Sequence, residues 1–339
     1  MPAIAIAVIG AGPWGQTLIR AFAGLPEARV RWICELDDER RARAGAVHPG
    51  ARLTGDADEA LHDPAVTAVV VAVEPARHHD VAMRVLAAGK HVFVEKPLAL
   101  SVRDASAVQH AAAARGLVLG VGHVLLHHDA TRRARQIVAD GVLGGPFTFE
   151  SSRTTPGAPR RTGSAWWALA PHDVSFALHL FAERPATVAA SGTKWGQSGE
   201  DNAASAVLHF VDGRTARIEV ARFAPRKRRA TTVAGPAATL TFDELAAPEQ
   251  TLRLWTPQNG TSLLPCGADD ALSAQCRDFL ACVARGDASG SHGTHAVDVV
   301  AVLEAGERSM RRGGAPQPVA LATDAGSAAR LEATSFEAA

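Results

Sequence analysis

Residues 4–15 read Ile-Ala-Ile-Ala-Val-Ile-Gly-Ala-Gly-Pro-Trp-Gly, a short apolar run that ends in spaced glycines. A helical pattern follows, so the order is strand, glycine turn and helix. In that context the spacing G-x-G-x-x-G indicates a dinucleotide site. Such a turn lets backbone amides approach a pyrophosphate, and the helix amino terminus adds partial positive charge for the anion. The residues of this turn that we expect at the cofactor are Gly10, Gly12, Pro13, Trp14 and Gly15.

A second predicted strand, residues 30–34, ends in Glu35. This acid follows the glycine turn by roughly twenty residues, as the dinucleotide fingerprint expects. A carboxylate there accepts hydrogen bonds from the adenosine ribose and disfavours a 2′-phosphate. We therefore expect NAD(H), with NADP(H) as the alternative because Arg40 and Arg41 are close in sequence. Glu35 could instead only begin a solvated acidic turn.

The alternation of strand and helix continues to about residue 122. Predicted strands cover residues 66–73, 91–94 and 117–121, and predicted helices cover residues 79–88 and 102–115. Strands separated by helices at this spacing indicate a parallel, doubly wound sheet. Residues 1–122 are therefore expected to form a Rossmann domain of the α/β class.

The predicted strand at residues 91–94 ends abruptly in Glu95-Lys96-Pro97. Proline disfavours helical geometry in the residue before it, so Lys96 should leave the strand extended. Open α/β sheets bind their ligands at the carboxyl ends of strands, where a cationic amine is well placed for chemistry. The alternative is an ordinary surface lysine in a loop.

Length, charge and cysteine usage narrow the class of protein. The 339 residues are enough for two domains. Lys plus Arg and Asp plus Glu both total 35, so net charge gives no reason to expect nucleic acid or an anionic membrane as a partner. The four cysteines show no C-x-x-C spacing, and no apolar run approaches the ~20 residues of a membrane helix. With no signal-peptide pattern at the amino terminus, we expect a cytoplasmic protein with reduced thiols.

The chain resembles the glucose–fructose oxidoreductase, inositol dehydrogenase and rhizopine-catabolism family, usually called Gfo/Idh/MocA. The resemblance is carried by residues 10–15, by Glu35, by Pro75 with His79, and by Ala-Gly-Lys-His-Val-Phe-Val-Glu-Lys-Pro at residues 88–97. It implies an NAD(P)-dependent oxidoreductase that moves a hydride between nicotinamide C4 and a carbinol or ketone carbon. The implied substrate is a sugar, sugar nucleotide or cyclitol.

The resemblance also implies roles for residues at the strand ends. Glu95 and Lys96 are expected at the cofactor, with Lys96 beside the nicotinamide and the reacting oxygen of the substrate. Pro75 and His79 are expected to contact the cofactor as well. Family members usually have Thr before Pro75, whereas this chain has Glu74, whose carboxylate we expect near the nicotinamide ribose.

Residues 123–320 are expected to form a second, α+β domain, followed by a loosely held tail at residues 321–339. Predicted helices cover residues 129–140, 166–181, 270–285 and 294–312, and predicted strands cover residues 147–153, 203–211, 215–223, 230–234 and 239–242. Asp212-Gly213 between two of these strands favours a hairpin. The resemblance implies an open, mostly antiparallel sheet whose outer face serves as the interface of a homo-oligomer.

The family's second catalytic element is an Asp followed four residues later by a His, a spacing that places both on one helical face. His172 takes the histidine position here, and Ala168 stands where the Asp is usual. Lys96 and His172 would then exchange a proton with the substrate alkoxide, and such acid–base help accelerates reactions roughly 10²–10⁴-fold. His172 could instead be a helix-start histidine bonded to backbone.

Substrate contacts are expected from His123, Arg153, Trp166 and Trp167. His123 follows the last predicted Rossmann strand, where relatives line the substrate pocket, and a metal site is not favoured there because no ligand cluster accompanies the histidine. Arg153 lies beside the loop leading to the site and could bind a carboxylate or phosphate in a bidentate fork. Trp166 and Trp167 either wall the pocket or fill the core.

Two other functions remain open from the sequence. The enzyme could reduce a non-sugar ketone or imine, a reaction that tolerates the loss of the Asp. The chain could also be a nucleotide-binding sensor or regulatory protein without catalysis. Ala168 and Glu74 favour that last alternative, while the intact Glu95-Lys96-Pro97 and His172 oppose it.

Overall fold

The computed structural model describes residues 3–156, 163–195, 199–267, 270–288 and 293–320. The chain divides into two compact units, Met1–Val124 with Asp270–Val300 and Leu125–Asp269 with Ala301–Ala339. The predicted boundary at residue 122 is close to Val124. The predicted second domain, however, is not continuous, because Asp270–Val300 groups with the first unit. The predicted tail at residues 321–339 lies outside the described residues.

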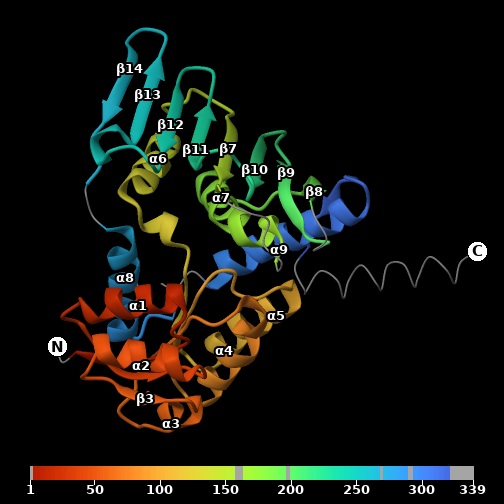
Figure 1. The fold of residues 1–339 in the computed structure, drawn as a ribbon. Coiled ribbons are helices and arrows are strands. Elements are labelled where there is room, and N and C mark those ends of the chain that lie inside the picture. Colours follow the sequence, from red (N-terminus) through yellow and green to blue (C-terminus); the bar gives the residue numbers. More distant parts are fainter. Residues whose placement is uncertain (1–2, 157–162, 196–198, 268–269, 289–292, 321–339) are drawn as a thin grey trace, which may run out of the picture. The chain divides into compact units, whose positions relative to one another are not determined.

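The first unit is built on a parallel sheet with the strand order β3-β2-β1-β4-β5-β6. Its strands are β1 (Ile4–Ile9), β2 (Ala28–Cys34), β3 (Arg52–Thr54), β4 (Ala68–Val71), β5 (His91–Val94) and β6 (Leu119–Val121). The connecting helices are α1 (Pro13–Ala23), α2 (Asp38–Val47), α3 (Ala57–Leu61), η1 (Pro75–Arg77), α4 (His78–Ala87) and α5 (Val102–Ala114), as Figure 1 shows. This order confirms the predicted doubly wound Rossmann sheet, whose direction of winding reverses between β1 and β4.

Local sequence explains why these elements form. Residues 68–71 in β4 are all buried, as expected of a strand covered on both faces. The side chain of Ser101 accepts a hydrogen bond from the backbone N–H of Asp104 and so caps α5. Pro13 begins α1 at a position where its missing N–H costs no helical hydrogen bond. Strand and helix therefore start where the local chemistry favours them.

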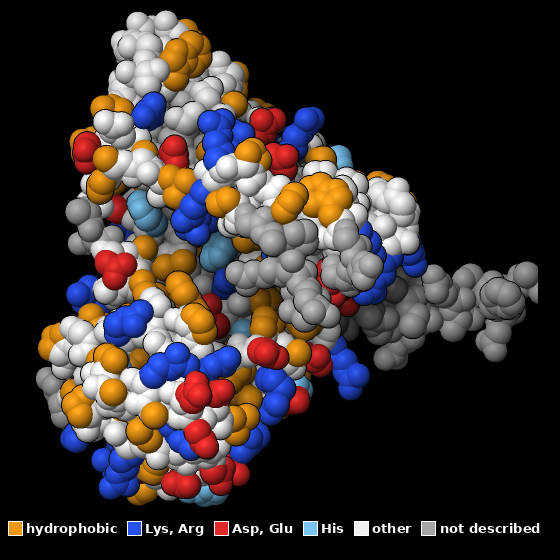
Figure 2. Space-filling view, in the orientation of Figure 1, with side chains coloured by type: hydrophobic (Ala, Val, Ile, Leu, Met, Phe, Trp, Pro, Cys, Tyr) orange, Lys and Arg blue, Asp and Glu red, His pale blue; other side chains and the backbone are white. Residues whose placement is uncertain are grey.

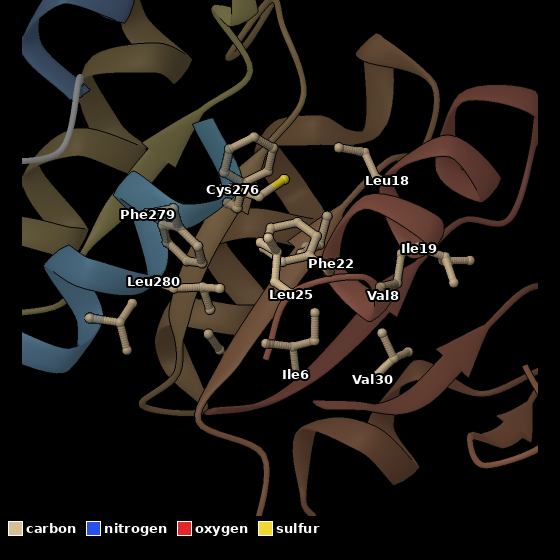
Figure 3. Close-up of a cluster of buried hydrophobic side chains, with 14 of the residues drawn as sticks. Ile6, Val8, Leu18, Ile19, Phe22, Leu25, Val30, Cys276, Phe279 and Leu280 are labelled. Carbon is tan, nitrogen blue, oxygen red and sulfur yellow. The ribbon is translucent and has the colours of Figure 1, made fainter. Parts of the chain in front are cut away.

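A cluster of buried apolar side chains joins distant parts of the chain in the first unit. Helix α8 (Ala271–Arg285) contributes Phe279, which packs edge-on against Phe22 and Phe93 at centroid distances of 6.5 and 5.5 Å. Figure 3 shows Cys276, Phe279 and Leu280 of α8 facing this cluster. Edge-to-face aromatic pairs stabilise by about 0.5–1.5 kcal/mol beyond the apolar area that they bury. This packing explains why Asp270–Val300 belongs to the first unit.

The second unit contains a mixed sheet with the order β14-β13-β12-β11-β7-β10-β9-β8-β15. Its strands are β7 (Thr148–Thr154), β8 (Thr187–Lys194), β9 (Asp201–His209), β10 (Thr215–Ala221), β11 (Arg228–Ala234), β12 (Thr239–Asp243), β13 (Leu252–Thr256), β14 (Gly260–Leu264) and β15 (Gln317–Pro318). Strands β7 and β10 pair parallel, and the other neighbours in this order pair antiparallel. The predicted mostly antiparallel sheet is therefore confirmed, although β8, β13, β14 and the two-residue β15 were not predicted.

The remaining helices are α6 (Asp129–Ala139), α7 (Ala165–Phe181), α9 (Gly293–Arg311) and the short turns η2 (Val124–His127) and η3 (Pro248–Gln250). Helix α7 packs against β7, β9 and β10 of the second sheet. Within the described residues, none of the helices combines the length and apolarity that crossing a membrane requires. Acidic and basic side chains are interspersed on the face shown in Figure 2.

Candidate cofactor and catalytic site

The glycine turn has the close packing that its sequence predicts. Gly10 has a φ of +99°, and a Cβ there would lie 2.5 Å from the carbonyl oxygen of Ala72. A Cβ on Gly15 would lie 2.1 Å from the carbonyl oxygen of Gly10. Around Gly12, in contrast, a Cβ would meet no heavy atom within 4 Å, and no side chain caps α1 there. The first N–H groups of α1 are thus left for an anion such as a pyrophosphate.

Glu35 is fixed against this turn. Its Oε2 accepts a 2.7 Å hydrogen bond from the backbone N–H of Ala11, and its Oε1 accepts a 3.1 Å bond from that of Asp37. Arg41 donates to the Glu35 carbonyl oxygen at 2.7 Å and to the Asp38 carboxylate, so its guanidinium is engaged close to the backbone. The carboxylate is therefore held beside the glycine turn, where the sequence predicts a ribose contact.

A cavity of about 730 Å³ runs along the carboxyl ends of β1, β2 and β4, within the usual size range of cofactor sites. Acidic and basic side chains both line the cavity, among them Glu35 and Glu74 and the basic residues Arg40 and Arg77. Of the residues predicted at the cofactor, those that line it are Gly10, Gly12, Pro13, Trp14, Gly15, Glu35, Glu74 and Pro75. These residues fit a bound dinucleotide.

The other residues predicted at the cofactor lie elsewhere in the first unit. The ring of His79 is partly exposed, and its Nδ1 lies 2.8 Å from the Asp80 carboxylate. His79 does not line this cavity, and its cofactor contact stays a prediction. Lys96 follows Glu95 at the carboxyl end of β5, the strand that pairs with β4. The end of β4 leads into Val73 and Glu74 of the cavity.

Glu95 is buried beneath this strand end, with 6% of the residue exposed. Its Oε2 accepts a 3.1 Å hydrogen bond from the backbone N–H of Lys96, while Oε1 has no hydrogen-bond partner among the described residues. A Cβ on Gly122 would come within 2.7 Å of Oε1, so a larger residue there would displace the Glu95 carboxyl group. Burial raises the pKa of Glu95, although a hydrogen bond from Trp14 and the charge of Lys96 oppose the shift. The buried carboxyl group thus holds the end of β5 by accepting the hydrogen bond from the backbone N–H of Lys96.

One buried histidine in this region was not predicted. His78 is 1% exposed, and its ring lies between the carbonyl oxygens of Pro97 and Val73. Helical spacing was the signal that could have found it, because Val81, Ala82 and Val85 share the buried face of α4. His79 carried the resemblance in sequence, but His78 is the histidine that contacts the Lys96–Pro97 segment.

In the second unit, His172 lies half-buried on α7, with Ala168 one turn before it. The helix begins where the Ser164 hydroxyl accepts a hydrogen bond from the backbone N–H of Trp166. No carboxylate can project from position 168, so the acid that relatives place there is missing. His172 keeps the position that the sequence predicts on this helix.

The two tryptophans of α7 have different surroundings. Trp166 is 0% exposed, and its indole N–H donates a 2.9 Å hydrogen bond to the carbonyl oxygen of Leu303. A Cβ on Gly306 would come within 2.6 Å of the indole ring. Trp166 therefore fills the core, one of the two alternatives left open by the sequence. Trp167 is half-buried.

Arg153 does not have the surroundings of a substrate-binding residue. It is 3% exposed, and its Nε donates a 2.7 Å hydrogen bond to the Asp173 carboxylate. Its other nitrogens donate to both oxygens of Glu244. Although burial lowers the pKa of the Arg153 guanidinium, the two carboxylates raise it more, so the pKa lies above its ordinary value. Arg153 thus lies near the end of β7, close to the end of the predicted strand, but its guanidinium is held in a buried ion cluster and not at a predicted substrate contact.

His123 is also buried, with 1% exposed, and its ring packs edge-on against His295 at a centroid distance of 5.6 Å. The nearby His128 caps α6 by accepting a hydrogen bond from the backbone N–H of Ala130. Within the described part of the chain, no group of three His, Cys, Asp or Glu side chains is arranged to hold a metal ion.

A glycine turn on a parallel sheet, an acid held against that turn and a cavity along the strand ends together indicate a dinucleotide-binding protein. The chain belongs to the Gfo/Idh/MocA oxidoreductase family. Residues 4–123 match the family's NAD-binding Rossmann fold, and residues 131–241 match a Gfo/Idh/MocA carboxyl-terminal domain. This confirms the resemblance and the predicted cofactor, NAD.

Individual relatives agree with this assignment. A solved structure of a putative oxidoreductase from Magnetospirillum magnetotacticum MS-1 is 30% identical, with a TM-score of 0.80 over 89% of this chain and 99% of that chain. The UDP-N-acetylglucosamine 3-dehydrogenase of Acidithiobacillus ferrooxidans is 26% identical over 82% of this chain and 88% of its own length. The scyllo-inositol 2-dehydrogenase (NAD(+)) of Bacillus subtilis is 26% identical over 65% of this chain and 67% of its own length.

Proposed function

We propose that this oxidoreductase acts on a sugar, sugar nucleotide or cyclitol, with Lys96 as its main acid–base group. The observation that carries the proposal is the position of Lys96 at the carboxyl end of β5, directly beside the strand whose end lines the NAD cavity. Ligands of open α/β sheets bind at this edge. The substrate class is supported by the names of two relatives, one a sugar-nucleotide dehydrogenase and the other an inositol dehydrogenase.

NAD, when bound, accepts or supplies the hydride at nicotinamide C4. Residues of this chain accept or donate the proton that accompanies the hydride transfer. In oxidation, the Lys96 amine takes the proton that leaves the substrate hydroxyl as the carbonyl forms. In reduction, the ammonium form of Lys96 donates a proton to the carbonyl oxygen of the substrate, on which negative charge develops. His172 is the proposed second group, which orients the same oxygen or shares its proton, and a histidine is suited to this because it titrates near neutral pH.

Reduction of a non-sugar ketone or imine is a second candidate, favoured by Ala168. Because position 168 carries only a methyl group, an alcohol bound there lacks the carboxylate that would orient its hydroxyl. A ketone or imine needs only a proton donor, which Lys96 supplies. A sensor without catalysis is the third candidate, and it predicts NADH binding without turnover.

The experiment that separates these candidates is a panel of initial rates in both directions. Cyclitols, sugar nucleotides and hexoses are offered with NAD⁺, and keto sugars, simple ketones and imines are offered with NADH. NADH binding is measured in parallel by fluorescence. Turnover confined to polyhydroxy substrates supports the proposal, turnover confined to simple ketones or imines supports the second candidate, and tight NADH binding without any turnover supports the sensor.

We further propose a cytoplasmic homo-oligomer that associates through the outer face of the second sheet. That face has a depression lined by residues of both signs, among them Glu150, Arg217, Glu219 and Arg228. Such a surface can pair with a second copy of itself. Reduced thiols in all four cysteines agree with a cytoplasmic location. Light scattering of the parent and of Arg217→Glu tests the interface, since loss of the oligomer is expected only in the variant.

A further inference from the structure

His78 links the two strand ends that the proposed chemistry uses. It is the first residue of α4 and is almost fully buried. Its Nδ1 lies 2.7 Å from the carbonyl oxygen of Pro97, the residue after Lys96. Its Nε2 lies 3.1 Å from the carbonyl oxygen of Val73, which lines the NAD cavity. One imidazole ring therefore connects the Lys96–Pro97 segment to the wall of the cofactor site.

The two contacts cannot be equivalent in a neutral ring. A neutral imidazole has one N–H and one lone pair, whereas both of its neighbours here are carbonyl acceptors. Burial lowers the pKa of His78, the two carbonyl groups raise it, and the positive charge of Lys96 lowers it further. The pKa lies below its ordinary value, so the ring is neutral at neutral pH. The shorter contact then identifies Nδ1 as the donor, an assignment of the proton from the hydrogen-bond network.

We propose that His78 is the positioning residue of the acid–base lysine. By donating its Nδ1–H to the Pro97 carbonyl, it fixes the backbone that carries Lys96 against the wall of the NAD cavity. The inference rests on the proposed function, in which Lys96 is the acid–base group. Losing this hydrogen bond should lower the rate by an amount that follows from geometry, because displacing a reacting group by about 1 Å can lower the rate on the order of 100-fold.

Two amide substitutions separate the two ring nitrogens. His78→Asn places an amide N–H near the position of Nδ1, and His78→Gln places it near the position of Nε2. We expect His78→Asn to keep kcat within about threefold of the parent and His78→Gln to lower it roughly 10- to 100-fold. His78→Phe fills the space of the ring without a donor, and it should behave like His78→Gln. NADH affinity should change by less than about threefold in all three variants.

The matched control is His62→Asn. The Nδ1 of His62 also contacts a backbone carbonyl oxygen, that of Asp58 at 2.8 Å, but the residue is exposed at the end of α3. His62→Asn should leave kcat, NADH affinity and the melting temperature unchanged. A purely structural role for His78 predicts a different pattern, in which kcat of the Asn, Gln and Phe variants follows their melting temperatures. That pattern, or a parent-like kcat in His78→Gln and His78→Phe, would overturn the inference.

A measurement on the parent protein covers the case in which a variant does not fold. Long-range proton–nitrogen NMR of ¹⁵N-histidine protein reports which ring nitrogen carries the proton. A neutral ring protonated at Nδ1 supports the inference, and one protonated at Nε2 overturns it. The proposed function is tested separately by Lys96→Met. Parent-like turnover of Lys96→Met defeats the proposed function, whereas an inactive Lys96→Met with fully active His78→Gln and His78→Phe defeats the role of His78 alone.

Discussion

The backbone N–H of Ala11 donates a 2.7 Å hydrogen bond to the carboxylate of Glu35, so this acid is held directly against the glycine turn. Preorganisation of this kind lowers the entropic cost of binding. If the proposed ribose contact holds, the same carboxylate disfavours the 2′-phosphate of NADP(H). We therefore predict that Glu35, at the end of β2, sets the cofactor preference.

Replacing Glu35 with Ser should shift the preference from NAD(H) toward NADP(H). Arg40 lines the same cavity and can pair with a 2′-phosphate once the carboxylate is removed. We expect the ratio of kcat/KM for the two cofactors to change by at least about tenfold, or roughly 1.4 kcal/mol. Glu39→Ala on exposed α2 is the control and should leave the ratio unchanged. A parent protein that already prefers NADP(H) would contradict the role of Glu35.

Lys96→Met should lower turnover by roughly two orders of magnitude or more while NADH affinity stays within a few-fold. The methionine keeps the length and apolar part of the side chain but cannot carry a proton. Fluorescence titration with NADH and steady-state rates measure the two quantities separately. Lys227→Met, at an exposed position, is the control. If Lys96→Met turns over like the parent, another group handles the proton.

Local sequence was sufficient to predict most of the Rossmann half of the fold, although α2, β3 and α3 were not predicted. The strand at residues 4–9, its glycine turn and the helix after it are specified by neighbouring residues, because close packing at Gly10 and Gly15 excludes other side chains. The same is true of Lys96, whose place at a strand end follows from the apolar run before it and the proline after it. Hydrophobic pattern and turn chemistry act over a few residues. The strand at residues 4–9, its glycine turn and the strand end at Lys96 can therefore be predicted without knowledge of distant contacts.

Features that depend on contacts between distant residues could not be predicted. Nothing in the local sequence indicates that Phe279 packs on Phe22 and Phe93, since many apolar faces could serve as partners for α8. The burial of Arg153 depends on Glu244, which lies far along the chain and joins it only when β7 and β12 enter one sheet. The helical spacing of α4 indicates that His78 is buried, but it does not indicate that the ring contacts the carbonyl oxygen of Pro97.

Arg153→Met should destabilise the protein by about 3–5 kcal/mol, because it leaves the buried carboxylate of Asp173 without the counter-charge of Arg153, whereas Glu244 keeps its 3.6 Å pair with Arg229. Urea unfolding followed by circular dichroism measures the change. Arg311→Met is the matched control, since its pair with Glu307 is exposed and such pairs contribute about 0–1 kcal/mol. An unchanged free energy of unfolding together with a raised substrate KM would instead restore Arg153 as a substrate-binding residue.

Glu95→Gln should change the dependence of stability on pH. Burial raises the pKa of Glu95 in the folded protein, so the native state holds this proton more tightly than the unfolded chain. The contribution of the group to stability is therefore full below the unfolded pKa of about 4.3 and is lost as the pH rises through the raised folded pKa. Glutamine cannot ionise, so the variant should lose less stability than the parent between pH 5 and pH 8, a comparison made by thermal unfolding. Identical pH profiles would show that Glu95 does not titrate in this range.

Ala168 gives the last prediction, because it stands one turn before His172, where the family resemblance implies a carboxylate. Glu74 could replace that group, since its side chain is exposed in the NAD cavity and caps no helix. If Glu74 does so, Glu74→Thr alone should lower the rate in both directions, and Ala168→Asp added to it should restore activity. If the enzyme mainly reduces a ketone or imine, neither change should lower the reductive rate by much, because protonated Lys96 suffices.

The decisive comparison measures Glu74→Thr, Ala168→Asp and the double variant in both directions, with melting temperatures to confirm that all three fold. A non-additive recovery in the double variant would show that the two carboxylates do the same work. Suppose instead that Glu74→Thr is harmless in both directions while Ala168→Asp raises oxidation by about tenfold or more, toward the acid–base gains seen in enzymes. That result would rule out both explanations, because it would mean that the carboxylate is needed for oxidation and that nothing in this chain replaces it.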